Sequence, residues 1–361
     1  MPPLVPYVLA LMVSAFAAVA APVEIAGPQF SGAMQPQAAV GKAGEIHVVF
    51  GIKDGVIFHT VSTDEARTFR APVKIGTLPK LAVGMRRGPR IVAAGAKLVV
   101  TAISHEQGDL LAWSSSDGGK QWTGPVKVND APKSAREGLH AMAGTGGSVA
   151  VAWLDLRGGS MELWGATSKD GGTSWGPNAR IYQSPDGPIC QCCAPSLAFG
   201  PGGELAAMWR DSLAGARDMR MALSRDGGQT FGPAEKLGTG TWKLNACPMD
   251  GGGITFLRDN PGKFLTVWRR EGTLYSALAG APEQALGEGR DAVIAASTRA
   301  PVMAWQTKAG LALKACGEPL RVLDPKGSAA SLAAAPDGRF VVIVWESRSK
   351  TEPALMAEIL R

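Results

Sequence analysis

Tyrosine, histidine and cysteine are scarce in this chain of 361 residues, which contains 3 Tyr, 4 His and 5 Cys. After residue 20, no apolar run approaches the ~20 residues that a membrane-spanning helix needs, so we expect no transmembrane segment in the mature chain. The net charge of +6 is mild, and acidic and basic residues are interleaved without a basic block. Nucleic acid is therefore not an expected partner.

The first 20 residues, MPPLVPYVLALMVSAFAAVA, contain no charged side chain and end in the small-x-small pattern Ala18-Val19-Ala20. This pattern is typical of a secretory signal peptide, although its first residues lack Lys and Arg. A retained membrane anchor is the alternative, but the run is short for a span and has no basic flank. We therefore expect a signal peptide at 1–20 and one domain at 21–361, working in the periplasm or outside the cell, where disulfides persist.

Glycine and proline are abundant, with 46 and 25 residues, and they separate many short apolar runs such as EIHVVF and KLVVTA. Runs of this length, bounded by turn-forming residues, are typical of β-strands. Long apolar patterns with a helical period are few. The sequence therefore predicts an all-β protein with many turns.

One eight-residue pattern occurs four times: STDEARTF (62–69), SSDGGKQW (115–122), SKDGGTSW (168–175) and SRDGGQTF (224–231). In each copy an Asp can accept hydrogen bonds from turn amides, and a Gly can take positive φ, so each copy predicts a hairpin turn. The four aspartates are Asp64, Asp117, Asp170 and Asp226. These segments resemble the Asp-box (BNR) repeats of the sialidase superfamily. The resemblance implies a β-propeller in which the Asp boxes are structural turns, found also in proteins that cleave nothing.

The number of blades follows from a second recurring pattern, a strand that ends in a bulky apolar residue. It occurs seven times, at VVF, VTAI, VAW, AMW, TVW, MAW and IVW. The last strand of each unit recurs only six times after residue 27, and APVEIAG (21–27) supplies the missing copy. We expect this segment to complete the C-terminal blade and to close the ring, which hides the sheet edges. The favoured architecture is thus a single propeller of seven four-stranded blades; six blades, as in sialidases, is the alternative.

The topology of a propeller places the Asp-box turns on the bottom face and a functional mouth on the top face, at the starts of the innermost strands. The motif CQCCAP brings three cysteines to this mouth. The candidate soft-metal ligands there are Cys190, Cys192, Cys193, Cys247, His140 and Met249. Such a set suits Cu or Zn. Two other interpretations stay open: a disulfide from the cluster to Cys247, with or without a second bridge inside CQCC, and inert buried thiols. Cys316 is expected to be a free thiol in a strand away from the mouth.

Arginines gather at the same mouth and predict an anionic ligand. The candidate ligand-binding residues are Arg90, Arg157, Arg210, Arg269, Asp155 and Asp250. Arginine binds carboxylates bidentately, and the resemblance to sialidases implies a clamp of three arginines beside a tyrosine nucleophile. The mature chain offers only Tyr182 and Tyr275, and neither falls where that family places its nucleophile. The plainer interpretation of the arginines is ion pairing that braces loops.

These observations predict an exported, sialidase-like β-propeller that binds a soft metal ion or an anionic or carbohydrate ligand at its mouth. A divergent exo-sialidase-type glycoside hydrolase is the alternative, and a protein-interaction scaffold is a second alternative. The expected partners are a small ligand or metal, a glycan, or another exported protein.

Overall fold

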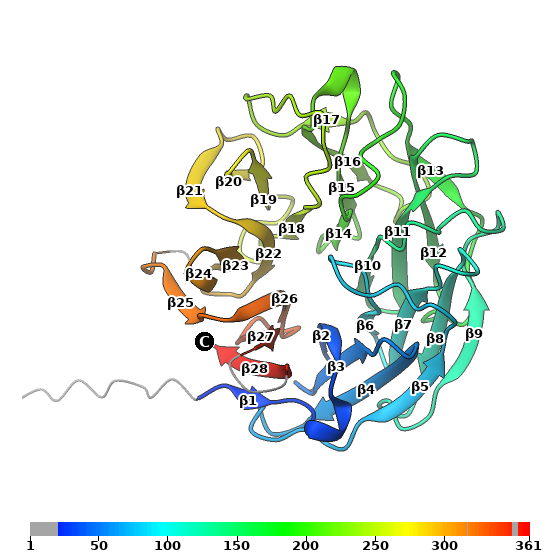
Figure 1. Cartoon of the computed structure of the whole chain (residues 1–361), viewed down its shortest axis with the longest axis vertical. Helices are drawn as coiled ribbons and strands as arrows, with labels where there is room; N and C mark the ends of the chain where they lie inside the picture. The colour runs from blue at the N-terminus through cyan, green and yellow to red at the C-terminus, as the bar shows by residue number, and fades with distance from the viewer. Residues whose placement is uncertain (1–20, 316, 349–352) are drawn as a thin grey trace, which may run out of the picture.

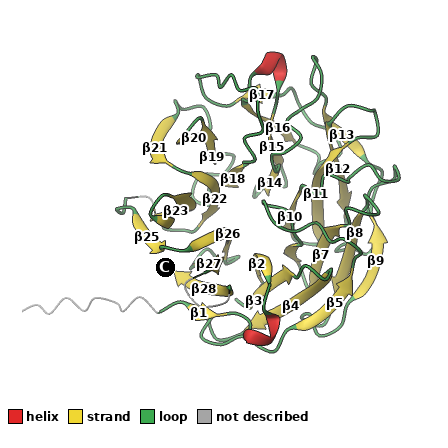
Figure 2. Ribbon diagram, viewed as in Figure 1, coloured by secondary structure: helices red, strands yellow, loops and turns green. Residues whose placement is uncertain are grey.

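The computed structural model describes residues 21–315, 317–348 and 353–361. In this part of the chain, 28 strands form seven four-stranded antiparallel sheets around a central opening (Figure 1). The helical segments described are two short 3-10 turns in loops, η1 (Pro28–Phe30) and η2 (Leu213–Gly215) (Figure 2). The fold is a seven-bladed β-propeller, so the all-β class and the favoured blade count are confirmed. The signal peptide predicted at 1–20, and Cys316, lie outside the described residues.

Each blade is a meander whose first strand lies nearest the axis and whose fourth is outermost. Blade one consists of β2 (Met34–Val40), β3 (Ile46–Gly51), β4 (Val56–Ser62) and β5 (Val73–Thr77), and blade two of β6 (Arg90–Ala94), β7 (Lys97–Ile103), β8 (Leu110–Ser115) and β9 (Thr123–Lys127). Blade three consists of β10 (His140–Thr145), β11 (Ser148–Asp155), β12 (Glu162–Ser168) and β13 (Ala179–Tyr182), and blade four of β14 (Ser196–Phe199), β15 (Leu205–Arg210), β16 (Met219–Ser224) and β17 (Glu235–Lys236). Blade five consists of β18 (Gly252–Phe256), β19 (Phe264–Arg270), β20 (Thr273–Leu278) and β21 (Gln284–Glu288). Blade six consists of β22 (Arg290–Ala296), β23 (Pro301–Thr307), β24 (Gly310–Ala315) and β25 (Arg321–Asp324). Blade seven consists of β26 (Gly327–Ala334), β27 (Val341–Ser347), β28 (Ala354–Leu360) and β1 (Val23–Glu24).

The ring closes through β1, which is the outermost strand of the last blade. Val23 pairs with Ala357 of β28, and the Ile25 amide donates to the Leu355 carbonyl oxygen at 2.8 Å. Ile25 is also buried against the core of the first and last blades. The predicted closure by the N-terminal segment is therefore confirmed. In Figure 1 the blue β1 lies beside the red β28.

The hydrophobic core lies between neighbouring blades. Its largest side chains include the bulky residues that end the second strands, namely Phe50, Ile103, Trp153, Trp209, Trp268, Trp305 and Trp345, and all seven are buried. Two of these indoles are held by carboxylates, because Trp153 donates to Asp155 at 2.7 Å and Trp345 donates to Asp324 at 2.9 Å. The recurring sequence pattern thus marks the packing of one blade on the next.

The Asp boxes form the turns between the third and fourth strands of the first four blades. In the third copy, Asp170 accepts hydrogen bonds from the Thr173 and Ser174 amides at 3.1 and 3.0 Å and from the Ser174 hydroxyl at 2.6 Å. The Ser174 hydroxyl and amide, with Ser168, lower the pKa of Asp170 to about 2. These aspartates therefore close turns, as their sequence pattern predicts.

Replacing Asp170 by alanine is expected to lower the free energy of unfolding by about 1 kcal/mol, because four turn hydrogen bonds, one of them from the Ser168 hydroxyl, are lost at a solvent-exposed site. Since the folded-state pKa of Asp170 is depressed, its stabilisation is present above pH ~4 and lost as the pH falls towards 2. Urea denaturation at pH 7 and pH 2.5 measures this. Equal losses at both pH values would contradict the assigned role.

Two histidines of blade one are packed between strands rather than exposed. His47 on β3 and His59 on β4 are buried, and their Nδ1 and Nε2 atoms lie 3.1 Å apart. The His59 ring also meets the Asp-box Trp122 of the next blade edge-on, at 5.3 Å between centroids. Burial lowers the pKa of His47 to about 4 and that of His59 to about 3.

Acid is expected to destabilise the protein through this pair. Both imidazoles are neutral in the folded state, so their contribution to stability is complete above the unfolded pKa of 6.5 and is lost as the pH falls towards 4. The melting temperature measured from pH 7 to pH 4 should fall less steeply in a His47→Gln, His59→Gln double variant than in the wild type. An identical slope in the two proteins would show that the pair does not titrate in this range.

Candidate functional site

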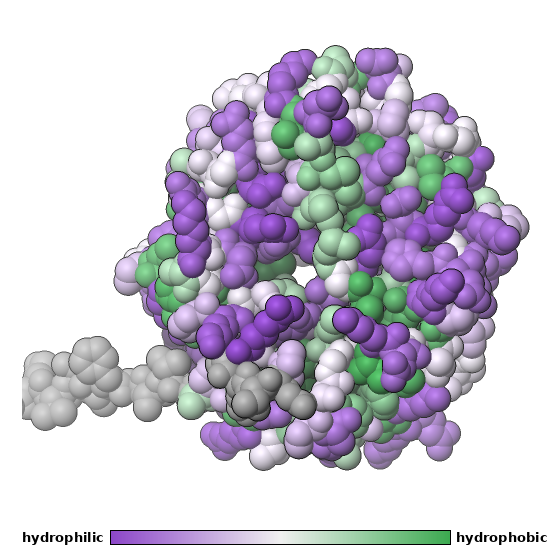
Figure 3. Space-filling model, viewed as in Figure 1, coloured by the Kyte–Doolittle hydropathy of each residue, from purple (hydrophilic) through white to green (hydrophobic). Residues whose placement is uncertain are grey.

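The axis of the propeller opens on one face into a cavity of about 420 Å³. Residues at the starts of innermost strands line it, among them Gln35 and His140, together with Arg86 from the loop before β6. Hydrophilic side chains border the central hollow on the face shown in Figure 3. The structure thus provides the mouth that the propeller topology predicts.

The three cysteines of CQCC form a compact sulfur cluster beside this cavity. The Cys190 Sγ lies 3.4 Å from the Cys193 Sγ and 3.7 Å from the Cys192 Sγ, and all three sulfurs lie within 4.8 Å of one another. Cys190 and Cys193 are buried, Cys192 is half-buried, and Cys247, which interacts with Cys192, is exposed. Cys190, Cys192, Cys193 and Cys247 carry free thiols in this structure. A disulfide staple among them stays the competing prediction.

Two loops bring the sulfurs together. The loop before β14 is fixed where the Cys190 amide donates to the Arg210 carbonyl oxygen at 3.0 Å, at the end of β15. The loop before β18 passes so close to Ala194 that a Cβ at Gly251 would lie 2.5 Å from the Ala194 carbonyl oxygen. Glycine is therefore required at residue 251, and it places the Asp250 amide against Cys193.

The three thiols of the cluster differ in the direction in which their surroundings shift the pKa. Burial opposes the charged form of Cys193, but hydrogen bonds from the Cys190 and Cys192 thiols, with the Arg210 charge, hold the pKa of Cys193 well below its usual range. The Cys192 thiol favours the charged form of Cys190, yet Cys193 and burial raise the pKa of Cys190 to about 12. The neighbouring thiols and burial also raise the pKa of Cys192. The surroundings of Cys193 thus favour a negative charge on its sulfur over one on Cys190 or Cys192.

His140 and Cys247 are not members of this compact set, which consists of the three CQCC cysteines. His140 is buried, its Nε2 lies 3.0 Å from the Thr101 hydroxyl, and it lines the axial cavity. Burial and the Arg90 charge hold the pKa of His140 well below its usual range. Met249 has φ +52°, in the left-handed region, in the loop that carries Cys247. Whether His140 or Met249 ligates a metal stays a prediction.

Of the predicted arginines, Arg157 is held by two carboxylates, those of Asp130 and Asp155. Its Nη1 donates to Asp130 at 2.7 Å, its Nη2 donates to Asp155 at 3.0 Å, and its guanidinium lies 3.7 Å from the Trp164 ring centroid. Asp155 is itself fully buried. This is the loop-bracing arrangement that the plainer interpretation describes.

Arg210 and Arg269 enclose an indole beside the sulfur cluster. Their guanidinium carbons lie 5.3 and 5.2 Å from the Trp242 ring centroid. Arg210 donates to the Arg217 and Arg269 carbonyl oxygens at 2.6 and 2.9 Å, and Arg269 donates to the Pro248 carbonyl oxygen at 3.0 Å. Sequence reasoning did not find Trp242. The Arg269 guanidinium thus supports the loop that carries Cys247, whereas the Arg210 guanidinium binds the loop after β15 and the end of β19. Neither arginine lines the axial cavity.

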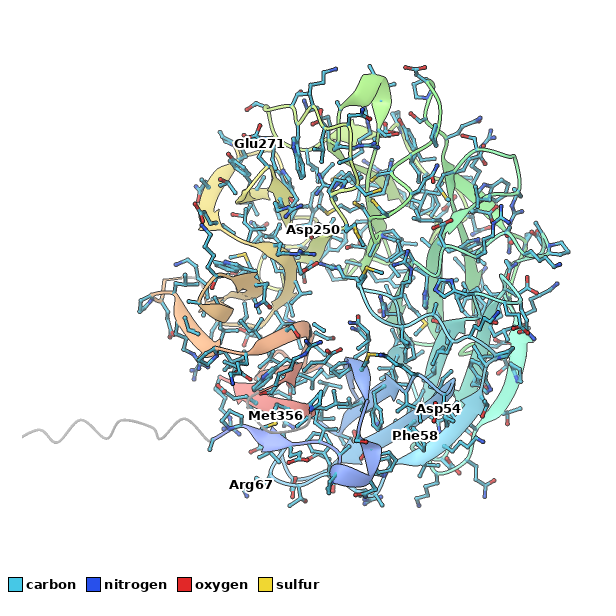
Figure 4. The ribbon with its side chains drawn as sticks, in the orientation of Figure 1. Asp54, Phe58, Arg67, Asp250, Glu271 and Met356 are labelled. Atoms are coloured by element: carbon cyan, nitrogen blue, oxygen red, sulfur yellow. The ribbon has the colours of Figure 1, made fainter. Side chains whose placement is uncertain are left out.

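Asp250 lies at the inner edge of blade five (Figure 4), where it is buried among arginines. Its Oδ2 forms an ion pair with the Arg269 Nε at 3.1 Å, too bent for a hydrogen bond, and its Oδ1 lies 3.8 Å from the Arg86 Nη1. Burial and the neighbouring Asp291 raise the pKa of Asp250 to about 6. Sequence reasoning missed Arg86 and Asp291; the only signal for Arg86 was a glycine-flanked Arg pair, GMRRG.

Neither of the two described tyrosines lines the axial cavity. Tyr182, on the outermost strand of blade three, donates to Asp211 at 2.8 Å, and burial with the Asp211 charge raises the pKa of Tyr182 to about 12. Tyr275 stacks on Trp268 and lies 3.9 Å under the Arg270 guanidinium. A raised pKa opposes the nucleophilic phenolate that a sialidase mechanism requires.

No protein-family model and no curated protein matches this sequence. Among solved structures of similar fold is a protein of unknown function from Dyadobacter fermentans, with 16% identity and a TM-score of 0.59 over 95% of this chain and 99% of that chain. The α-L-arabinofuranosidase Arb93A of Fusarium graminearum has 13% identity and a TM-score of 0.54 over 95% of this chain and 98% of that chain. The intramolecular trans-sialidase of Ruminococcus gnavus has 11% identity and a TM-score of 0.54 over 91% of this chain and 94% of that chain. The chain is a sialidase-like β-propeller.

At these identities the likeness concerns the fold of the sialidase-like propeller and leaves the chemistry of its site open. The site has two separate parts: a sulfur cluster between the loops before β14 and β18, and a polar axial cavity. In the described part of the chain, no helix is long and apolar enough to cross a membrane.

Proposed function

We propose that this sialidase-like propeller is an exported protein that binds a soft metal ion, Cu(I) or Zn(II), through the thiolates of Cys190, Cys192 and Cys193. The observation that carries the proposal is the convergence of three sulfurs within 4.8 Å of one another. The predicted signal sequence at 1–20 supports export.

The spacing of the sulfurs fits such an ion. Zn–S bonds of ~2.3 Å in a tetrahedral site separate two sulfurs by about 3.8 Å, and a trigonal thiolate site requires similar spacing. The observed separations of 3.4 and 3.7 Å need only a small expansion. A disulfide instead requires an approach to about 2.05 Å.

The surroundings of the cluster also suit a bound metal. Arg210 and the Asp250 amide stabilise negative charge on Cys193, and a thiolate is the form that ligates. The half-buried Cys192 and the exposed Cys247 leave one side of the cluster open to solvent. A metal ion or a metal-carrying partner can reach the sulfurs from that side, and Cys247 is placed to supply a fourth ligand.

The other predicted functions have less support. Hydrolysis of sialosides needs a tyrosine and an arginine clamp at the mouth, but the tyrosines lie away from the cavity, and Arg157, Arg210 and Arg269 are bound to carboxylates or main-chain oxygens. A plain scaffold gives no reason for three sulfurs within 4.8 Å of one another. Four arginines were predicted to hold an anionic or carbohydrate ligand, and of these only Arg90 lines the axial cavity.

The test is an anaerobic titration of the fully reduced protein with Cu(I) and, separately, with Zn(II). We expect stoichiometric binding, release of protons from the coordinating thiols, and a melting temperature that rises with the logarithm of free metal concentration. Thiols of unreduced protein are counted in parallel. If native protein has four cysteines in disulfides and takes up no metal after mild reduction, the cysteines are staples and the proposal fails.

A further inference from the structure

The axis of the propeller is a tunnel in which two cavities meet. The second cavity, about 740 Å³, lies below the mouth cavity of about 420 Å³. Eight residues line both cavities, and at least one comes from the innermost strand of every blade. We call this set the waist ring: Gln37, Arg90, Met142, Leu197, Ile254, Ile294, Ser331 and Leu332.

Arg90 is the charged member of the waist ring, and its other members are apolar or uncharged. Its Nη1 donates to the Gly88 and Pro89 carbonyl oxygens at 3.1 and 3.2 Å, and its Nη2 donates to the Arg86 carbonyl oxygen. In the described residues, no carboxylate forms an ion pair with Arg90. A guanidinium has five N–H donors, so the Nε–H and one Nη2–H remain for a ligand.

Other charges along the tunnel reinforce that of Arg90. The two cavities are lined by six basic side chains (Lys42, Arg86, Arg90, Arg258, Arg290 and Arg348) and by two acidic ones, Asp291 and Glu346. Both acidic residues lie in the mouth cavity, and the described lining of the second cavity has none. A concave surface of one sign concentrates small ions of the opposite sign. The excess of basic side chains therefore favours anions over cations in the tunnel.

We propose that the waist ring binds a small inorganic oxyanion, of the class of sulfate and phosphate, held by the two remaining N–H donors of the Arg90 guanidinium. A guanidinium edge matches two oxygens of an oxyanion in a bidentate pair. A charge left without a counter-ion in a largely apolar ring is costly, and the oxyanion removes that cost. This site is distinct from the sulfur cluster and does not depend on metal binding there.

Calorimetric titration of metal-free protein with sodium sulfate and with sodium phosphate, in a buffer free of other oxyanions, tests the site. We expect binding by the wild type and at least tenfold weaker binding by Arg90→Gln, with Arg90→Lys intermediate because a lysine keeps the charge but loses the fork. Arg225→Gln removes an exposed arginine from an Asp-box turn and should bind like the wild type. Sulfate should raise the melting temperature of the wild type and of Arg225→Gln but not that of Arg90→Gln.

A second variant decides the matter if Arg90→Gln fails to fold. Leu197→Glu places a fixed carboxylate in the waist ring as an internal counter-ion, and it should abolish oxyanion binding while Arg90 is retained. Oxyanion binding that survives in Leu197→Glu, equal affinities of wild type and Arg90→Gln, or no binding by the wild type would each overturn the proposal.

Discussion

A Cys193→Ser variant is expected to bind Cu(I) more weakly than the wild type by about a hundredfold or more. Loss of a residue that only orients a metal ligand typically costs 10- to 100-fold in affinity, and Cys193 is proposed as a ligand itself. It is also the sulfur that accepts hydrogen bonds from both neighbouring thiols and faces Arg210. A serine hydroxyl neither ionises near neutral pH nor suits a soft ion.

Competition titration against a Cu(I) chelator, with reduced protein under anaerobic conditions, measures this change. Cys316→Ser is the matched control, since it removes one thiol and leaves all three CQCC cysteines. His140→Ala tests the predicted histidine ligand, because it weakens Cu(I) binding only if the imidazole leaves Thr101 and reaches the sulfurs. A Cys193→Ser protein with wild-type affinity would show that copper binds elsewhere.

Removal of residues 22–27 is expected to lower the free energy of unfolding by roughly 4–6 kcal/mol. The deletion removes the pairing of β1 with β28 and the buried side chain of Ile25, which is 2% exposed. Burial of one large aliphatic side chain is worth about 2–4 kcal/mol, and each ladder hydrogen bond adds about 1 kcal/mol. The last blade would also present a free strand edge, so soluble yield should fall.

Thermal and urea denaturation of the shortened chain, beside the chain that begins at Ala21, measure the loss. Ile25→Ala separates the packing contribution from the strand pairing, and Val23→Thr is a control that keeps both strand propensity and backbone pairing. Unchanged melting temperature and solubility after the deletion would mean that β1 contributes nothing to closure.

Much of the fold could be predicted from the sequence because its signals are local and periodic. The Asp-box turn depends on side-chain to main-chain bonds within a few residues, as at Asp170, and each copy fixes one blade. The bulky residues that end the second strands, such as Trp209, repeat because each must fill the space between two blades. Only six copies of the last-strand pattern follow residue 27, so the seventh was assigned to the N-terminal segment, which forms β1.

The candidate site was predictable only where sequence neighbours become spatial neighbours. The crowding of Cys190, Cys192 and Cys193 is local, so their convergence followed from the motif itself. The partners of long side chains did not follow. Arg157 is bound to Asp130, 27 residues away, and Arg86 reaches across the axis to the Ala292 carbonyl oxygen, 206 residues away. Such partners are set by the paths of loops, which no local pattern encodes.

The closure of the ring by two distant ends of the chain sets an order for folding. Each of the first six blades is a continuous stretch of sequence, so it can form as soon as its four strands are available. The last blade joins Val23 to Ala357, and loop-closure entropy opposes a contact of such long range until the other blades are in place. The first strand of the described chain, β1, is therefore the last to find its partner. The seam between β1 and β28 has two residue pairs. Because this pairing is so short, we expect local opening of the native ring to begin at the seam.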